Sequence, residues 1–309
     1  MKSQTKGSLL LLLTTIIWGT TFVAQDTAMA FIGPYAFQFS RSIVGCVVLL
    51  PVIFLFDIQK KKAPDYVAPT KADQKTLVLG GVICGFFLCV ASCFQQVGIA
   101  MGTSGGKAGF ITAMYILFVP ILGLFLGKRV APMLWLCVAL ACVGLYLLCL
   151  DGETGGFVAS DLIVLACGVV FSFQILAVDH FAARVDCLKL ASLQFLFSGL
   201  FSSVPMLIFE GSGELLNVPL ALWQILFAGV LSCGVAYTLQ MVGQKYTEPA
   251  IASLIMSLEA VFATISGVFF LPDGVLSLRE FAGCGVMLVA IILSQINFKN
   301  VSRGSGNKS

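Results

Sequence analysis

The chain has 309 residues, of which 59% are hydrophobic and only 11% are charged. Soluble domains carry about 25% charged residues. This composition therefore excludes a water-soluble globular protein and predicts an integral membrane protein that has the lipid bilayer as its solvent. The formal net charge is +3, and the positions of the basic residues, given below, relate it to membrane topology and not to nucleic-acid binding.

A membrane-spanning helix needs about 20 mostly apolar residues. We predict an all-α protein with ten transmembrane helices, separated mostly by short turns that leave no room for a soluble catalytic or nucleic-acid-binding domain. The longest loop, 57–75, has three consecutive lysines and two prolines, and we expect it to be a solvated linker. In chain order, the predicted spans are 8–28, 34–56, 76–101, 105–127, 131–150, 161–181, 188–209, 220–243, 250–271 and 279–298.

Basic residues accumulate in cytoplasmic loops of membrane proteins, and this bias predicts the orientation. If both termini are cytoplasmic, fifteen of the eighteen Lys and Arg residues lie on that side. The bias thus predicts the orientation, and we separately expect a multi-pass protein of the cell membrane, specifically of the cytoplasmic membrane of a prokaryote. These residues are Lys2, Lys6, Lys60, Lys61, Lys62, Lys71, Lys75, Lys128, Arg129, Arg184, Lys189, Lys245, Lys299, Arg303 and Lys308.

The eleven cysteines lie almost entirely inside predicted spans, without a C-x-x-C pair and with a single histidine in the chain. Buried cysteine behaves as a small apolar residue. We therefore expect no metal site and no cofactor.

A short motif occurs twice, as Gln95-x-Val97-Gly98 and, 145 residues later, as Gln240-x-Val242-Gly243. Nearer the start of each half the offset grows to about 153, which aligns Trp18 with Phe171 and Arg41 with Gln194. The pattern predicts two five-helix repeats, residues 1–150 and 151–309. Because five is odd, the second repeat enters the membrane from the opposite side. Such inverted repeats are typical of secondary transporters, which bind substrate near the midplane between the halves.

Three segments resemble a known family: Trp18-Gly19-Thr20-Thr21-Phe22, Pro34 followed by Arg41, and Ser257 to Phe262. On these residues the chain is similar to the EamA family of the drug/metabolite transporter superfamily. The resemblance implies a ten-helix exporter or exchanger of small metabolites, often amino acids. The chain departs from the family at Gly127-Lys128 and Pro272-Asp273, where members often carry Gly-Glu.

Ionisable side chains at membrane depth are costly, and they are candidate functional residues. Glu259 lies near the middle of the ninth span, where burial penalises the anion, so it is the candidate for proton coupling. Arg41 in the second span keeps its charge and needs a counter-ion, a set of carbonyls or a substrate carboxylate; a pair with Glu259 is one option. Lys107 opens the fourth span and either extends to the interface or contacts an anion.

Uncharged polar and aromatic side chains within the spans complete the candidate substrate site. Amides and phenols can bind a zwitterion, but they can equally join helices to one another. These candidates are Trp18, Gln38, Gln95, Tyr115, Gln174, Gln194, Tyr237 and Gln240.

We predict a secondary active transporter that exports a small-molecule substrate such as an amino acid by alternating access, with proton coupling through Glu259. The alternative is uptake or exchange without proton coupling. A membrane enzyme would need clustered His, Asp or Ser, and a channel or receptor would need a polar stripe or filter motif; neither is visible. No GxxxxGK[ST] loop occurs, so ATP-driven transport would need another subunit. The sequence leaves the oligomeric state open.

Overall fold

The computed structural model describes residues 2–62, 64, 67–128, 130–149, 158–270 and 277–305, and every regular element among them is helical. The predicted all-α class is therefore confirmed. The α-helices are α1 Lys2–Ala28, α2 Pro34–Lys61, α3 Lys71–Ala100, α4 Gly105–Thr112, α5 Tyr115–Phe125, α6 Pro132–Cys149, α7 Ala159–Ala182, α8 Cys187–Pro205, α9 Leu222–Phe227, α10 Tyr237–Gln244, α11 Pro249–Met256, α12 Glu259–Phe270 and α13 Leu278–Ser305. Two π-helices, η1 Met206–Glu210 and η3 Ala228–Ala236, and one 3₁₀-helix, η2 Ser212–Asn217, complete the fold.

Eight helical segments within the described residues are long and apolar enough to cross a membrane. They correspond to predicted spans one to four and six to nine. The fifth prediction falls on α6, whose apolar stretch Pro132–Leu147 is shorter, and the tenth falls on α13. The structure thus confirms a multi-pass helical membrane protein, and the count of ten spans stays a prediction. The eight are Gln4–Ala28, Pro34–Lys61, Lys71–Ala100, Gly105–Phe125, Ala159–Ala182, Cys187–Glu210, Leu222–Gln244 and Pro249–Phe269.

The predicted linker 57–75 is shorter than expected, because helices occupy both of its ends. α2 continues to Lys61, and α3 already begins at Lys71. Thr70 explains the early start of α3: its hydroxyl accepts from the amide of Asp73, and the Asp73 carboxylate accepts from the amide of Thr70. This capping box stabilises a solvated helix turn that hydropathy alone does not detect.

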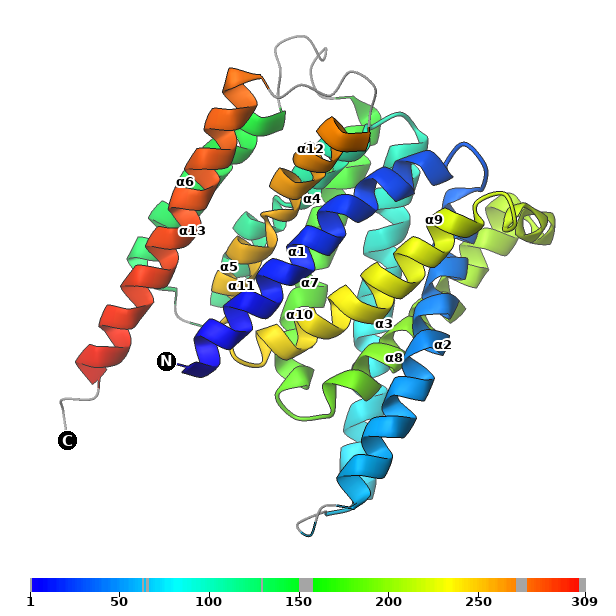
Figure 1. Ribbon diagram of the computed structural model, residues 1–309, viewed down its shortest axis with the longest axis horizontal. Helices are drawn as coiled ribbons and strands as arrows, with labels where there is room; N and C mark the ends of the chain where they lie inside the picture. The colour runs from blue at the N-terminus through cyan, green and yellow to red at the C-terminus, as the bar shows by residue number, and fades with distance from the viewer. Residues whose placement is uncertain are drawn as a thin grey trace.

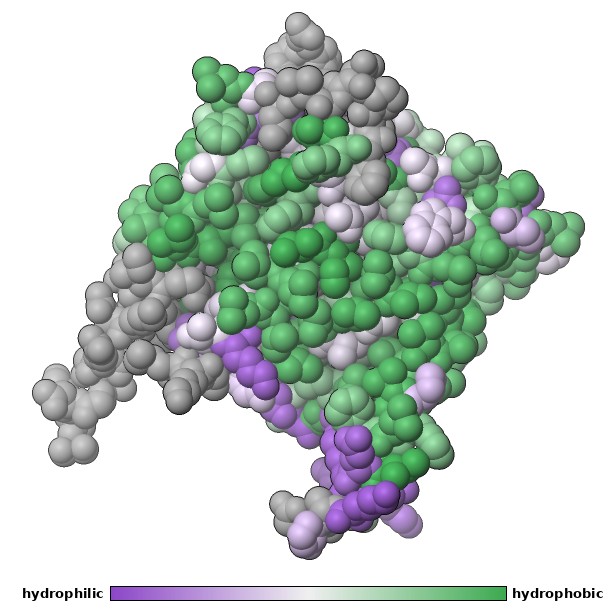
Figure 2. Space-filling model, viewed as in Figure 1, coloured by the Kyte–Doolittle hydropathy of each residue, from purple (hydrophilic) through white to green (hydrophobic). Residues whose placement is uncertain are grey.

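The helices form one bundle, with α6 and α13 side by side at one edge and α2, α3 and α8 at the other (Figure 1). The visible face is largely apolar, and hydrophilic residues gather near the N-terminal end of α1 and the adjoining ends of α2 and α3 (Figure 2). Large apolar side chains such as Phe54, Phe125 and Trp223 are 66%, 85% and 72% exposed. Such a surface suits lipid, because lipid solvates apolar side chains that would be a liability in water.

The glycine that ends the first copy of the repeated motif lies at a tight helix crossing. A Cβ atom on Gly98 of α3 would lie 2.3 Å from Cγ2 of Val164 and 3.1 Å from the carbonyl oxygen of Ser160, both on α7. The third helix of the first half therefore packs directly on the first helix of the second half.

The second copy makes the reciprocal contact. A Cβ atom on Gly243 of α10 would lie 2.8 Å from Cγ of Leu11 and 3.1 Å from the carbonyl oxygen of Gly7, both on α1. These two α1 residues precede their α7 counterparts by 153 residues, the offset predicted for this part of the repeat. The repeated glycine thus serves the same purpose twice, and it allows two helix backbones to approach closely.

A second reciprocal pair lies deeper in the bundle. A Cβ atom on Gly85 would lie 2.7 Å from the carbonyl oxygen of Gln194, and one on Gly229 would lie 3.1 Å from that of Arg41. This glycine pair is offset by 144 residues, one fewer than the motif. Gly229 and Gly243 are therefore separated by one residue more than Gly85 and Gly98. The π-helix η3 contains Gly229 and continues to Ala236, so it occupies part of this longer interval. A π-turn accommodates one extra residue in a helix, which explains the change in register.

Candidate functional site

A small cavity lies at the centre of the bundle, where helices from both halves meet. Its volume is about 30 Å³, enough for water but far below the several hundred Å³ of a metabolite site. Eight of the eleven candidate residues line it: Trp18, Arg41, Gln95, Tyr115, Gln174, Tyr237, Gln240 and Glu259. Trp18 and Phe171, aligned by the repeat, both face this cavity.

Two of the spans break where they meet the cavity. The fourth span changes from α4 to α5 at residues 113–114, and the ninth changes from α11 to α12 at residues 257–258. The two breaks are 144 residues apart, so they occupy equivalent places in the repeat. Each places a candidate residue, Tyr115 or Glu259, at the first position of the following helix. Discontinuous helices of this kind form the substrate and ion sites of many transporters.

Arg41 extends from α2 to the cavity wall and is only 5% exposed. Its Nε donates to Oε1 of Gln38 at 2.6 Å, and its Nη1 donates to Oε1 of Gln25 at 2.7 Å. The guanidinium also lies 5.4 Å from the centre of the Phe37 ring. Among the ion pairs of the described residues none involves Arg41, so Glu259 is not its counter-ion. A positive charge held only by neutral groups attracts an anion, and guanidinium is suited to bind a carboxylate.

Glu259 is 4% exposed, and its carboxyl group lies within hydrogen-bonding reach of the Tyr115 hydroxyl. The Trp18 indole nitrogen and Oε1 of Gln240 have no hydrogen-bond partner in the described part of the chain. Buried polar atoms are nearly always hydrogen-bonded. A donor and an acceptor without protein partners, gathered at one cavity, therefore indicate a site for water or a polar ligand.

Aromatic rings and amide side chains form the rest of the cavity wall. The rings of Trp18 and Tyr237 lie 4.7 Å apart, and Tyr237 contacts Phe195 at 5.3 Å. Tyr237 therefore offers an apolar surface next to a polar cavity. Gln95 donates to Oγ1 of Thr112 at 3.0 Å, which connects α3 to the end of α4.

The two remaining glutamine candidates lie behind the wall and hold wall residues in place. Gln38 accepts the Arg41 bond and donates to Ser198 at 3.2 Å. Gln194 accepts from Gln174, which in turn accepts from Gln240, at 3.1 and 3.3 Å. Both lie outside the residues that line the cavity.

Lys107 lies away from the cavity, in an ion pair that connects α4 to α7. Its Nζ is 2.6 Å from Oδ2 of Asp161, whose side chain is fully buried. Asp161 also accepts from the Thr103 hydroxyl and the Val158 amide, both at 3.0 Å. This pair joins the two halves at the end of the bundle opposite the N-terminus.

Other residues of the wall were absent from the sequence-based candidates. Gln25 carried a usable signal, because it is an amide inside an apolar span. The others are common residue types in membrane helices, and only their packing identifies them: Thr21, Phe22, Thr112, Phe171, Ile175 and Ser232.

Comparison with known proteins places these features in context. The profile of the EamA-like transporter family matches residues 5–150 and again 158–295. An uncharacterized transporter of Archaeoglobus fulgidus is 28% identical over 289 residues, which cover 92% of this chain and 84% of that protein. A solved crystal structure matches with a TM-score of 0.71 at 18% identity, covering 96% of this chain and 99% of the other. The structural match supports the fold alone.

Proposed function

The chain belongs to the EamA-like transporter family, and from that premise we propose that this membrane transporter exports a small dipolar metabolite, such as an amino acid, by alternating access. In this proposal ten spans form two inverted five-span halves, with the central cavity between them as the substrate site. The family and the transporter relative point to transport and not to catalysis.

The reciprocal contacts support the inverted arrangement. Gly98 packs on α7 as Gly243 packs on α1, and the spans containing Tyr115 and Glu259 break at equivalent places. Two halves related by a two-fold axis in the membrane plane would produce such pairs. Rocking one half against the other would then expose the cavity alternately to the two sides.

The observation that carries the substrate class is the pair of ionisable side chains, Arg41 and Glu259, on one cavity wall. Arg41 has no anionic partner among the described residues, and Glu259 has no cationic one. A solute with a carboxylate and an ammonium group would satisfy both, and Trp18 and Tyr237 would contact an apolar side chain. Because the cavity holds only about 30 Å³, binding requires these walls to separate.

Glu259 also provides a route for proton coupling. A carboxyl group that faces a closed, buried cavity can alternate between a proton and the ammonium group of a solute. A proton entering from outside would displace the solute outward. Exchange without coupling is the alternative, and the Glu259→Gln variant separates the two.

The test uses purified protein reconstituted in liposomes, after a thermal-shift screen of amino acids and related metabolites has identified a ligand. Arg41→Met should reduce kcat/KM about 30-fold or more, because truncating one partner of a buried charged contact costs about 2–5 kcal/mol. Arg279→Met is the matched control, since Arg279 lies over the Tyr146 ring and not on the cavity wall.

Glu259→Gln should abolish accumulation driven by a pH gradient while exchange of solute continues. Unchanged pH-driven accumulation in Glu259→Gln would contradict proton coupling and leave exchange. Arg41→Met protein that folds and transports like the wild type would contradict the substrate site.

A further inference from the structure

A second cavity, of about 660 Å³, is lined in part by the turn between α10 and α11. This turn lies at the end of the bundle that carries the N-terminus (Figure 1). We call this cavity the inner vestibule; its polar wall consists of Lys128, Asp179, Gln244, Lys245, Thr247 and Glu248. Its volume lies within the range of about 300–1,000 Å³ that is usual for small-molecule sites. Unlike the central cavity, it can hold a small metabolite in the conformation described here.

Two basic and two acidic residues of the described chain line the inner vestibule. Lys128 forms an ion pair with Asp179 across the two halves. Lys245 and Glu248 take part in no ion pair of the described chain, and Glu248 lies within electrostatic range of the Lys128–Asp179 pair. The vestibule therefore offers one uncommitted cation and one uncommitted acid, three residues apart around the turn between α10 and α11.

One buried polar atom of the vestibule also has no hydrogen-bond partner within the described ranges. It is Oε1 of Gln244, on a side chain that is 2% exposed. The amide nitrogen of Gln244 already donates to the carbonyl of Ile175 at 3.0 Å, so its oxygen is left for another donor. Buried atoms of this kind are rare unless water or a ligand satisfies them.

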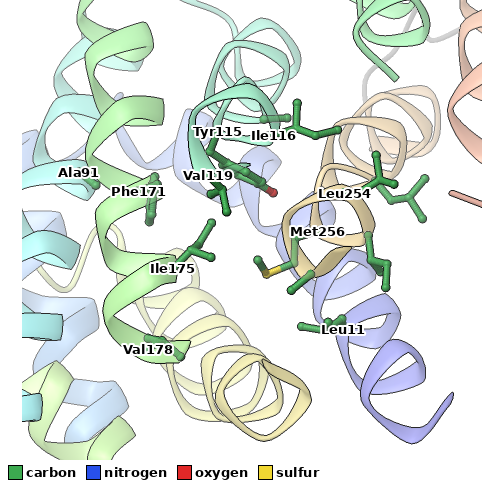
Figure 3. Close-up of a cluster of buried hydrophobic side chains, with 14 of the residues drawn as sticks. Leu11, Ala91, Tyr115, Ile116, Val119, Phe171, Ile175, Val178, Leu254 and Met256 are labelled. Atoms are coloured by element: carbon green, nitrogen blue, oxygen red, sulfur yellow. The ribbon is translucent and has the colours of Figure 1, made fainter. Parts of the chain in front are cut away.

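The vestibule lies about one helical turn from the central cavity. On α10, Gln240 lines the central cavity and Gln244, four residues later, lines the vestibule. On α5, Tyr115 lines the central cavity and Val119, again four residues later, lines the vestibule. Four residues rise about 6 Å along a helix. Figure 3 shows Val119, Ile175 and Met256 gathered near Tyr115, and all are at most 2% exposed. A thin apolar layer thus separates the two spaces.

We propose that the inner vestibule is a second binding site for a solute that carries a carboxylate and an ammonium group, held by Lys245 and Glu248 before it enters the central cavity. Oε1 of Gln244 would accept a hydrogen bond from the ammonium group. The identity of the solute rests on the proposed function, whereas the existence of a second site rests on the vestibule itself.

The experiment measures how many molecules of radiolabelled leucine each chain binds in equilibrium dialysis of detergent-purified protein. The wild type should bind two at saturation, and Lys245→Gln and Glu248→Gln should each bind one. Both residues are exposed, so neither change threatens folding, which size-exclusion chromatography checks. Lys71→Gln is the control, because Lys71 is an exposed lysine at the start of α3 outside the vestibule, and this variant should bind two.

Arg41→Met distinguishes the two sites, because it should lose the central molecule and keep the one that depends on Lys245. One molecule per wild-type chain, lost in Arg41→Met and kept in Lys245→Gln, would overturn the vestibule site alone. If Arg41→Met binds two molecules, the central site is overturned. If the wild type binds two molecules and Lys245→Gln binds one, the vestibule site is still supported. No leucine bound by the wild type would overturn both sites for this solute class.

Discussion

Replacing Gly98 with alanine should destabilise the protein, although alanine favours a helix. The new Cβ would lie 2.3 Å from Cγ2 of Val164 and 3.1 Å from the carbonyl oxygen of Ser160. Val164 cannot rotate away easily, because β-branched residues in helices have one preferred χ1 rotamer, and a backbone carbonyl cannot move alone. Overpacking costs about 1–3 kcal/mol, and alanine regains about 1 kcal/mol of helix propensity.

A contact of 2.3 Å places the overpacking cost at the upper end of that range. The net expectation is therefore a loss of about 2 kcal/mol, which corresponds to a fall of about 3 °C in melting temperature for a chain of this size. The assay is thermal unfolding in detergent at a fixed heating rate, because membrane proteins commonly unfold irreversibly. The melting temperature of Gly243→Ala should fall by a similar amount, since its new Cβ would lie 2.8 Å from Cγ of Leu11.

Two comparisons make the test specific. Gly106→Ala should melt at or above the wild-type temperature, because no heavy atom lies within 4 Å of its new Cβ. The double variant Gly98→Ala/Val164→Ala should lose less than the sum of the single changes, because the second change makes room for the first. A Gly98→Ala protein that melts at or above the wild type would refute the tight crossing, and additive losses in the double variant would refute Val164 as the obstacle.

Three further predictions concern charged residues. Lys107→Met should lower the free energy of unfolding by about 3 kcal/mol, because it leaves the Asp161 carboxylate buried without its cation. Adding Asp161→Asn should recover most of this loss. A double variant no more stable than Lys107→Met would contradict the prediction. Glu259→Gln should melt at or above the wild type while losing pH-driven transport, because functional groups are often unfavourable for stability; a clear fall in melting temperature would indicate a structural role. Burial opposes ionisation of Asp186, but its ion pair with Lys60 and two capping amides outweigh burial and hold its pKa below the ordinary value. The ionised Asp186 therefore stabilises the fold fully above the unfolded-state pKa, and this stabilisation is lost as the pH falls through the folded-state pKa. The melting-temperature difference between wild type and Asp186→Asn should therefore stay constant down to about pH 4 and shrink as the pH is lowered further. A difference that grows below about pH 4 would contradict this sign.

The sequence by itself determined the solvent, the helical class and the internal repeat. Composition alone required lipid, because a chain with 11% charged residues cannot cover a soluble core. The spacing of Gln95-x-Val97-Gly98 and its copy predicted which helices are equivalent, because duplicated segments keep their order along the chain. Charges within apolar spans identified Arg41 and Glu259, since lipid makes them costly unless they face something polar.

Tertiary structure decided which polar side chains face the cavity and which support it. Gln174 and Gln194 are both amides in apolar spans, yet Gln174 lines the wall and Gln194 lies behind it. The difference depends on helix rotation, and close packing at glycines such as Gly85 sets that rotation. The pairing of Lys107 with Asp161 and the inner vestibule depend likewise on contacts between residues far apart in the chain. Hydropathy carries no information on such contacts, because it averages over all faces of a helix.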